Sequence, residues 1–227
     1  MPPKMTLFYD CVSPWSWIQM EVLLRYEKFW NVELVLEPFF LGGVNNKTGN
    51  VPPGTNPFKG AYMNKILDVA RGMYEMKLKG PAFFPAVTMK EMRALRVIKH
   101  RYTRDTLVEC SRECWRCYWE EGRNPEKDED LIIHLGRVLG QDTVKKILAE
   151  DITKEIKDEL IAITNEAVDT YGAFGAPWTA AVNDEGKTMS FFGSDVMERL
   201  AFHMKKEYLG PFPEREAARR KAASPRL

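Results

Sequence analysis

The first forty residues constrain the fold most, because they read as strand, helix and strand with short connections. Residues 5–10 (MTLFYD) are apolar and aromatic, as β-strands often are. Residues 15–30 carry apolar side chains at three- and four-residue steps, which predicts a helix that follows Ser13-Pro14 and ends at Asn31. Residues 32–41 predict a second strand. Two strands joined by one helix form a βαβ unit, so we expect them to be parallel, in an α/β protein.

The middle of the chain predicts helices. Residues 42–60 are rich in glycine, asparagine and proline, which predicts a loop. From residue 61 to about residue 170 the apolar side chains follow helical spacing, with a break at residues 80–86 (GPAFFPA). The expected helices lie within residues 61–76, 87–102, 105–122, 128–140 and 154–172.

The end of the chain returns to strands. Residues 179–183 and 188–192 flank NDEGK, which predicts a β-hairpin. A further helix is expected to begin at Ser194-Asp195 and to stop at Gly210. Residues 214–227 are charged and alanine-rich, and we expect them to pack poorly.

The composition argues against several classes of protein. The 33 Lys and Arg residues nearly balance 32 Asp and Glu, and the formal net charge of +1 is not that of a typical nucleic-acid binder. The first ten residues lack the apolar stretch of a signal peptide, and no apolar run reaches the ~20 residues that span a membrane. We therefore expect a soluble, intracellular protein without membrane insertion.

The four cysteines do not suggest a secreted disulfide scaffold. Cys110, Cys114 and Cys117 have the spacing of a radical iron–sulfur motif, but on a helix the same spacing places them on one face. Packing in a core or interface is the expectation, and no metal is expected. Cys11, two residues before Ser13, is expected to be a small apolar residue at the strand end; the alternative is a redox-sensitive thiol.

The segment Ser13-Pro14-Trp15-Ser16 stands where a strand leads into a helix. Serine is a favoured N-cap and proline suits the first helical position, so by itself this segment reads as a helix start. Redox proteins of the thioredoxin type carry Cys-x-x-Cys at this place, and the two serines exclude a dithiol cycle here. A helix N-terminus still favours a bound anion, including the thiolate of a ligand.

Four sequence blocks resemble the kappa-class glutathione transferases over nearly the whole chain. They are LFYD-x-x-SPWSW, GN-x-PPG with PFKG-x-YM at residues 49–63, YGAFG-x-P at 171–177 and FGSD-x-ME at 192–198. More distant relatives are 2-hydroxychromene-2-carboxylate isomerases and bacterial disulfide oxidoreductases. The resemblance implies an α/β thioredoxin-like fold with an inserted all-helical domain. Residues 1–60 and 171–227 would form the thioredoxin-like domain, and residues 61–170 the insertion.

The resemblance also implies where the thiol and glycyl ends of glutathione bind. Ser13 would donate a hydrogen bond to the thiolate, with Pro14 and Trp15 as the wall around it. Lys59 would meet the glycyl carboxylate and Asn50 would hydrogen-bond near it. A lone loop lysine is otherwise read as solvated.

The remaining positions would hold the middle and the γ-glutamyl end. Pro57 would shape the loop beside the ligand. Ala176 would pair through its main chain with the cysteinyl part, before a cis Pro177; the alternative is an ordinary strand entry. Ser194 would hold the γ-glutamyl carboxylate and Asp195 its ammonium group, or the two form only a helix cap.

The function implied is conjugation of glutathione to small electrophiles, with peroxidase activity as a further possibility. The alternatives are a glutathione-dependent isomerase of the 2-hydroxychromene-2-carboxylate type and a non-enzymatic glutathione- or partner-binding protein. Members of the family are homodimers, so a homodimer is expected. The last residues, Pro225-Arg226-Leu227, resemble a degenerate peroxisomal address, so peroxisome or mitochondrion is the expected location, with the cytosol as a further possibility.

Overall fold

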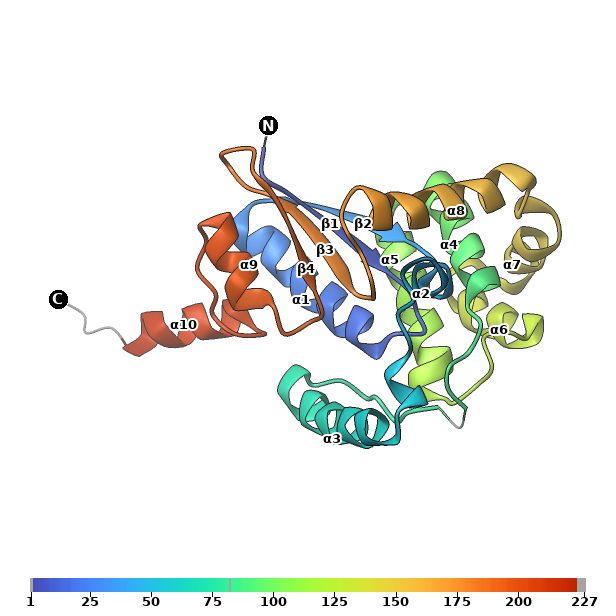
Figure 1. Ribbon diagram of the computed structural model, residues 1–227, viewed down its shortest axis with the longest axis horizontal. Coiled ribbons are helices and arrows are strands. Elements are labelled where there is room, and N and C mark those ends of the chain that lie inside the picture. The colour runs from blue at the N-terminus through green and yellow to red at the C-terminus, as the bar shows by residue number, and fades with distance from the viewer. Residues whose placement is uncertain (1, 82, 224–227) are drawn as a thin grey trace.

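A computed structural model describes residues 2–81 and 83–223 (Figure 1). Within these ranges one four-stranded sheet forms, in the order β2-β1-β3-β4. The strands are β1 (Lys4–Tyr9), β2 (Glu33–Pro38), β3 (Trp178–Val182) and β4 (Thr188–Phe192). β1 runs parallel to β2, and β3 runs antiparallel to β1 and β4. The predicted βαβ unit and hairpin are therefore confirmed.

Ten α-helices occupy most of the remaining described residues. They are α1 (Pro14–Trp30), α2 (Leu41–Thr48), α3 (Pro57–Tyr74), α4 (Met89–Arg101), α5 (Arg104–Trp115), α6 (Asp128–Leu139), α7 (Gln141–Lys146), α8 (Lys154–Asp169), α9 (Met197–Met204) and α10 (Pro213–Ala223). Short turns of 3₁₀-helix (Pro53–Thr55) and π-helix (Arg116–Glu120 and Ile147–Asp151) extend this set. In the view of Figure 1, helices α4 to α8 lie to the right of the strands, and α9 and α10 lie to their left. None of the described helices is both long and apolar enough to span a bilayer.

Helix α1 begins and ends as its sequence predicts. The side chain of Ser13 accepts a hydrogen bond from the backbone N–H of Ser16, and Pro14 occupies the first helical position, where no N–H is needed. Asn31 ends the helix in the left-handed conformation with φ of 52°, which asparagine tolerates better than most residues.

The sheet buries side chains on both faces, because successive residues of a strand point to opposite sides. On one face, alternate residues of β1 (Met5, Leu7, Tyr9) join the larger core with α1, α4, α5 and α9. The opposite face forms a smaller core. Its members include Phe8, Val44, Ala167, Trp178 and Ala180. Helices from the middle of the sequence thus cover a sheet that is built from its two ends.

The prediction of a loop over residues 42–60 was wrong at both ends, because residues 42–48 belong to α2 and residues 57–60 to α3, and it holds for residues 49–56, which contain the 3₁₀ turn. Val44 of α2 is fully buried in the smaller core beside α8, and this packing overrides the low helix propensity of the glycines and asparagines. Helix α3 starts at Pro57 because the side chain of Asn56 accepts hydrogen bonds from the N–H groups of Phe58 and Lys59. The proposed domain boundary after residue 60 stays a prediction.

The C-terminal part of the chain also differs from expectation. Helix α9 starts two residues after Asp195, with Val196 as its N-cap, and ends at Lys205 in the left-handed conformation with φ of 54°. Helix α7 and the π-helical turn after it were not predicted. The described part of the segment expected to pack poorly is helical, contacts α1 and pairs Arg215 with Glu75 at the end of α3. None of residues 214–223 is buried, which agrees with the expected poor packing. Residues 224–227, with the peroxisome-like ending, lie outside the described residues.

A buried carboxylate joins three segments at the carboxyl end of β1. Asp10, which is fully buried, accepts hydrogen bonds from the N–H of Val12 at 3.0 Å, the N–H of Leu41 at 2.8 Å and the Oγ1 hydroxyl of Thr88 at 2.7 Å. Burial raises the pKa of Asp10, and these three hydrogen bonds oppose that rise. The β1–α1 loop, the start of α2 and the start of α4 therefore share one acceptor.

We expect Asp10→Ala to lower the free energy of unfolding by about 3 kcal/mol or more, because it leaves two buried backbone N–H groups without acceptors. Thr88→Val, which removes a single donor, should cost about 1 kcal/mol. Urea denaturation followed by circular dichroism measures both values. Equal losses of unfolding free energy in the two variants would show that the three hydrogen bonds to Asp10 together contribute no more than one ordinary hydrogen bond.

Candidate active site

Ser13 lies at the N-terminus of α1 and is the centre of the candidate site. Its hydroxyl accepts from the N–H of Ser16 at 3.2 Å and donates to the carbonyl oxygen of Ala176 at 3.3 Å. The first turn of a helix carries N–H groups without intrahelical acceptors and the positive end of the helix dipole. An anion beside Ser13 would therefore meet both a hydroxyl donor and a favourable field.

Two tryptophans of the helical insertion hold the loop that carries Ser13. The indole Nε1 of Trp115 donates to the carbonyl oxygen of Ser13 at 3.1 Å, and that of Trp119 donates to the carbonyl oxygen of Cys11 at 3.3 Å. The ring of Trp115 stacks on Trp17 of α1, with centroids 5.8 Å apart and planes 4° apart. The insertion thus fixes the main chain on either side of Val12.

The segment before β3 lies next to Ser13, because β1 and β3 are antiparallel neighbours and the end of β1 pairs with the start of β3. The peptide bond between Ala176 and Pro177 is cis, as the family resemblance implied, and β3 begins at the next residue. The carbonyl of Pro177 accepts from the N–H of Gly193 at 3.0 Å. The carbonyl of Ala176 is left facing the hydroxyl of Ser13, so the two predicted residues lie in contact.

A cavity of about 430 Å³ opens above Ser13. Its walls are mostly apolar, and among residues 2–81 and 83–223 no Asp, Glu, Lys, Arg, His, Cys or Tyr side chain contributes to the lining. The polar lining side chains are Ser13, Asn45, Asn50 and Thr88. The apolar and main-chain part of the wall consists of Val12, Pro14, Trp15, Phe40, Leu41, Gly42, Val51, Pro52, Pro53, Met63, Phe84, Pro85, Ala86, Val87, Gly175, Ala176 and Phe192.

Of the predicted glutathione-binding residues, Ser13, Pro14, Trp15, Asn50 and Ala176 line this cavity. The amide nitrogen of Asn50 donates to the carbonyl of Phe174 at 2.6 Å, which ties the loop after α2 to the segment before β3. Lys59 lines a neighbouring depression of about 470 Å³, and Trp15, Pro53 and Met63 belong to the walls of both.

The other predicted residues lie outside these two hollows. Pro57 occupies the first position of α3, next to Asn56, and contributes to neither wall. Ser194 is buried, and Asp195 lines a third hollow beside β4 and α9. Phe192 belongs both to that hollow and to the Ser13 cavity, so one aromatic side chain separates them.

The sequence analysis missed two parts of the cavity wall. Residues 40–45, read as strand end and loop, contribute the start of α2. Residues 84–86, read only as a break between helices, and residues 87–88, read as the start of a helix, contribute the opposite wall. Both segments are brought to the cavity through Asp10, which accepts hydrogen bonds from the N–H of Leu41 and from the hydroxyl of Thr88. No pattern along the sequence indicates that pairing.

The three histidines lie away from the cavity. His100 contacts Glu159, and His203 meets the carbonyl of Ala181. His134 is buried beside Glu113 and Arg137, and burial lowers its pKa. No described histidine is therefore placed to act as a base for Ser13.

Comparison with known proteins identifies the family. The DSBA-like thioredoxin domain matches residues 4–205. The chain is 33% identical over 225 residues to glutathione S-transferase kappa 1 of Homo sapiens, across 96% of this chain and 98% of that protein. It is 34% identical over 223 residues to glutathione S-transferase kappa 1 of Rattus norvegicus, across 93% and 95%.

A solved 2-hydroxychromene-2-carboxylate isomerase superposes with a TM-score of 0.72 at 16% identity, covering 98% of this chain and 100% of that one, which shows a shared fold. The thioredoxin-like fold expected from the sequence is thus confirmed. The two nearly full-length matches above 30% identity show in addition which branch of this fold the chain represents. The chain belongs to the DSBA-like thioredoxin domain family and, within it, to the kappa-class glutathione S-transferases.

Proposed function

We propose that this protein is a glutathione transferase that stabilises the thiolate of bound glutathione beside Ser13. The observation that carries the proposal is the Ser13 hydroxyl at the N-terminus of α1, facing an apolar cavity whose lining has no ionisable side chain. A thiolate in this cavity has the hydroxyl and the helix dipole as its stabilising groups. Full-length relatives named glutathione S-transferase kappa 1 support the same function.

The Ser13 hydroxyl can change its acceptor at little cost. In the structure it donates to the carbonyl of Ala176 over 3.3 Å, a long hydrogen bond for two oxygen atoms. A thiolate beside Ser13 would accept the hydrogen bond from this hydroxyl in place of the carbonyl, and a charge-assisted hydrogen bond is stronger than the neutral one it replaces. Because no lining side chain can act as a base, the proton released from the thiol leaves to solvent.

The rest of glutathione would extend along the neighbouring surfaces. The cysteinyl part would pair with the main chain at Ala176, and the glycyl carboxylate would reach Lys59 in the hollow that shares Trp15. The γ-glutamyl end would lie beyond Phe192, toward Ser194 and Asp195. The glycyl carboxylate of glutathione would thus lie beside Lys59, and the γ-glutamyl ammonium group would lie beside Asp195.

The apolar wall is suited to a small hydrophobic co-substrate. Phe40, Phe84 and Phe192 line the same cavity as Ser13, from the residue before α2, from the segment before α4 and from β4. With an aryl halide, the thiolate would attack the ring carbon, form a C–S bond and release halide. With a hydroperoxide, the thiolate would attack the terminal oxygen, release an alcohol and become a sulfenic acid. A second glutathione thiol would then attack that sulfur, form the disulfide and release water. Holding both reactants in one cavity is the main catalytic contribution.

Ser13→Ala should lower kcat for conjugation by about 100-fold, the effect of losing one donor to a developing or existing anion. Glutathione affinity should change by less than about threefold, because the other contacts remain. The thiol pKa of bound glutathione, followed by thiolate absorbance, should rise toward that of the free thiol. Ser13→Ala also removes the helix cap, so its fold is checked by denaturation.

Ser16→Ala is the matched control for Ser13→Ala. Ser16 lies in the same helical turn, is fully buried, and its hydroxyl oxygen has no hydrogen-bond partner. We expect unchanged kcat and thiol pKa in this variant. Unchanged turnover in folded Ser13→Ala would remove Ser13 from the mechanism, and an unshifted thiol pKa in the unaltered protein would indicate a binding site without activation.

Trp115 is proposed as a positioning residue for Ser13. Trp115→Phe keeps an aromatic ring against Trp17 but removes the indole N–H that bonds the Ser13 carbonyl. We expect kcat to fall about tenfold. Adding this change to Ser13→Ala should cause no further loss, because positioning matters only while the hydroxyl is present. Additive losses in the double variant would assign Trp115 a purely structural role.

Product analysis distinguishes the reactions that one thiolate could perform. We expect an aryl halide to give a glutathione adduct and one halide per turnover, and an organic hydroperoxide to give an alcohol and glutathione disulfide. An isomerase would return free glutathione with a rearranged co-substrate, and that result alone would replace the transferase assignment. No turnover of any kind, with glutathione bound, would favour a non-enzymatic binding protein.

The remaining expectations from the family stay predictions. These are association into a homodimer and residence in the mitochondrion or peroxisome. Sedimentation of the purified protein tests the first, and imaging of the tagged chain with an untagged C-terminus tests the second.

A further inference from the structure

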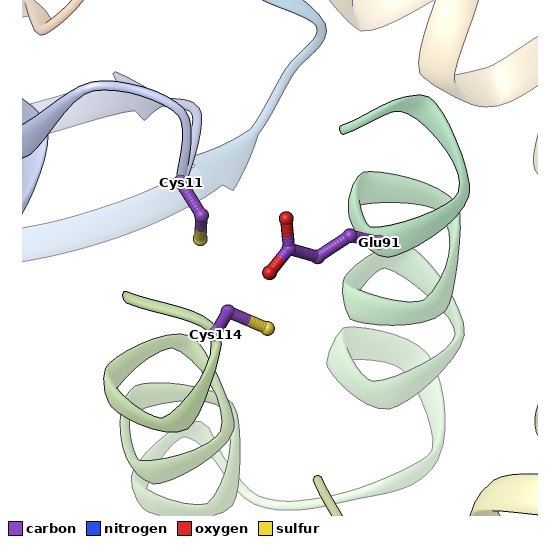
Figure 2. Close-up of side chains that lie close together, drawn as sticks. All are labelled: Cys11, Glu91 and Cys114. Carbon is purple, nitrogen blue, oxygen red and sulfur yellow. The ribbon is translucent and has the colours of Figure 1, made fainter. Parts of the chain in front are cut away.

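Two thiols and a carboxylate from three different segments converge beneath the Ser13 loop. They belong to Cys11 in the β1–α1 loop, Glu91 in the first turn of α4 and Cys114 near the end of α5 (Figure 2). The two sulfur atoms and a carboxylate oxygen all lie within 4.8 Å of one another. Figure 2 shows the three side chains pointing toward a common centre.

The three side chains are enclosed by protein. Glu91 is 1% exposed, as is Cys11, and Cys114 is 0% exposed. Neither carboxylate oxygen of Glu91 accepts a hydrogen bond from an N–H or O–H group, and the nearest donor is the weak S–H of Cys114. Among the described residues no Lys, Arg or His forms an ion pair with Glu91, whereas the buried side chains of Asp10 and Glu113 both accept hydrogen bonds.

An unpaired buried carboxylic acid is costly, and a second acid lies close by. Burial, together with the neighbouring carboxylate of Asp10, raises the pKa of Glu91 to about 8. Burial likewise raises the pKa of Cys11 to about 12. Several acidic groups thus share one dry region in which no described residue forms an ion pair with Glu91. Such groups either stay protonated or, when ionised, need a cation beside them.

We propose that Cys11, Glu91 and Cys114 form a binding site for Zn²⁺ or a similar soft divalent cation. Thiolate sulfur and carboxylate oxygen are accepted zinc ligands, at about 2.3 Å and 2.0–2.2 Å from the metal. Ligand atoms at such distances are about 3.4–3.8 Å apart in a tetrahedron, so side-chain shifts of under an ångström would close the set. The fourth position would hold a water molecule.

Binding is a proton-for-metal exchange without oxidation or reduction. Each thiol loses its proton, Glu91 loses its proton where it is protonated, and the released protons pass to solvent as two Zn–S bonds and one Zn–O bond form. The cation would then tie the β1–α1 loop to α4 and α5. Because Cys11 stands two residues before Ser13, metal occupancy would stiffen the loop that carries the candidate catalytic hydroxyl. The site itself requires no glutathione.

The test is metal analysis of the intact folded chain. The protein is equilibrated with Zn²⁺, both in the folded state and during refolding, until bound metal is constant, and zinc is counted by mass spectrometry after chelator competition. Co²⁺ is used in parallel, because thiolate ligands give it a charge-transfer absorption band. We expect one Zn²⁺ per chain, a Co²⁺–thiolate band and a higher Tm with zinc.

Variants separate this site from general thiol binding. Cys114→Ala and Glu91→Gln should each weaken zinc binding by at least ~100-fold, since losing a direct ligand costs more than losing an outer-shell partner. The matched controls are Cys110→Ala and Cys117→Ala, which remove fully buried thiols from the same helical stretch but outside the cluster. They should keep the metal and the cobalt band.

Three results would overturn the proposal. The first is no retained metal in the unaltered protein under either loading procedure. The second is equal loss of zinc in the cluster variants and in Cys110→Ala or Cys117→Ala, with circular dichroism showing all of them folded. The third is a Cys11–Cys114 disulfide formed by an added hydroperoxide in a chain that binds no metal, which would make the pair a redox pair.

Discussion

The site depends on the hydrogen bonds that the buried carboxylate of Asp10 accepts. Its two oxygens accept hydrogen bonds from the loop after β1, from the first residue of α2 and from the residue before α4. These same three segments supply much of the wall of the Ser13 cavity. A single acceptor in the interior therefore sets the distance between the helix N-terminus that would hold a thiolate and the apolar surfaces that would hold its reaction partner.

The helical insertion does more than cover the sheet. Through Trp115 and Trp119 it donates to main-chain carbonyls on both sides of Val12, and these hydrogen bonds hold a loop that has no regular structure of its own. Because Trp115 holds the main chain of Ser13, the hydroxyl of Ser13 can donate its hydrogen bond either to the carbonyl of Ala176 or to a ligand. Rigidity of the loop and freedom of one hydroxyl are what thiolate stabilisation at this position would require.

Beneath that loop, the Cys11, Glu91 and Cys114 cluster shows why spacing along a sequence is a limited guide to metal sites. Cys110, Cys114 and Cys117 repeat along one helical stretch and are all buried, as packing predicts. The group that converges instead takes one member from each of three segments, with 80 residues between Cys11 and Glu91. Only the folded chain brings them together.

The sequence by itself determined the local elements whose signals are carried by neighbouring residues. The βαβ unit, the cap at Ser13-Pro14, the end at Asn31 and the β3–β4 hairpin follow from periodicity and from the conformations that single residues prefer. The family followed from motifs spread along the chain. Tertiary structure decided what depends on distant partners: α2 forms because Val44 is buried near α8, the C-terminal α10 packs on α1, and segments 40–45 and 84–88 become cavity walls. Burial of apolar surface and satisfaction of Asp10 are non-local, so local sequence patterns could not reveal them.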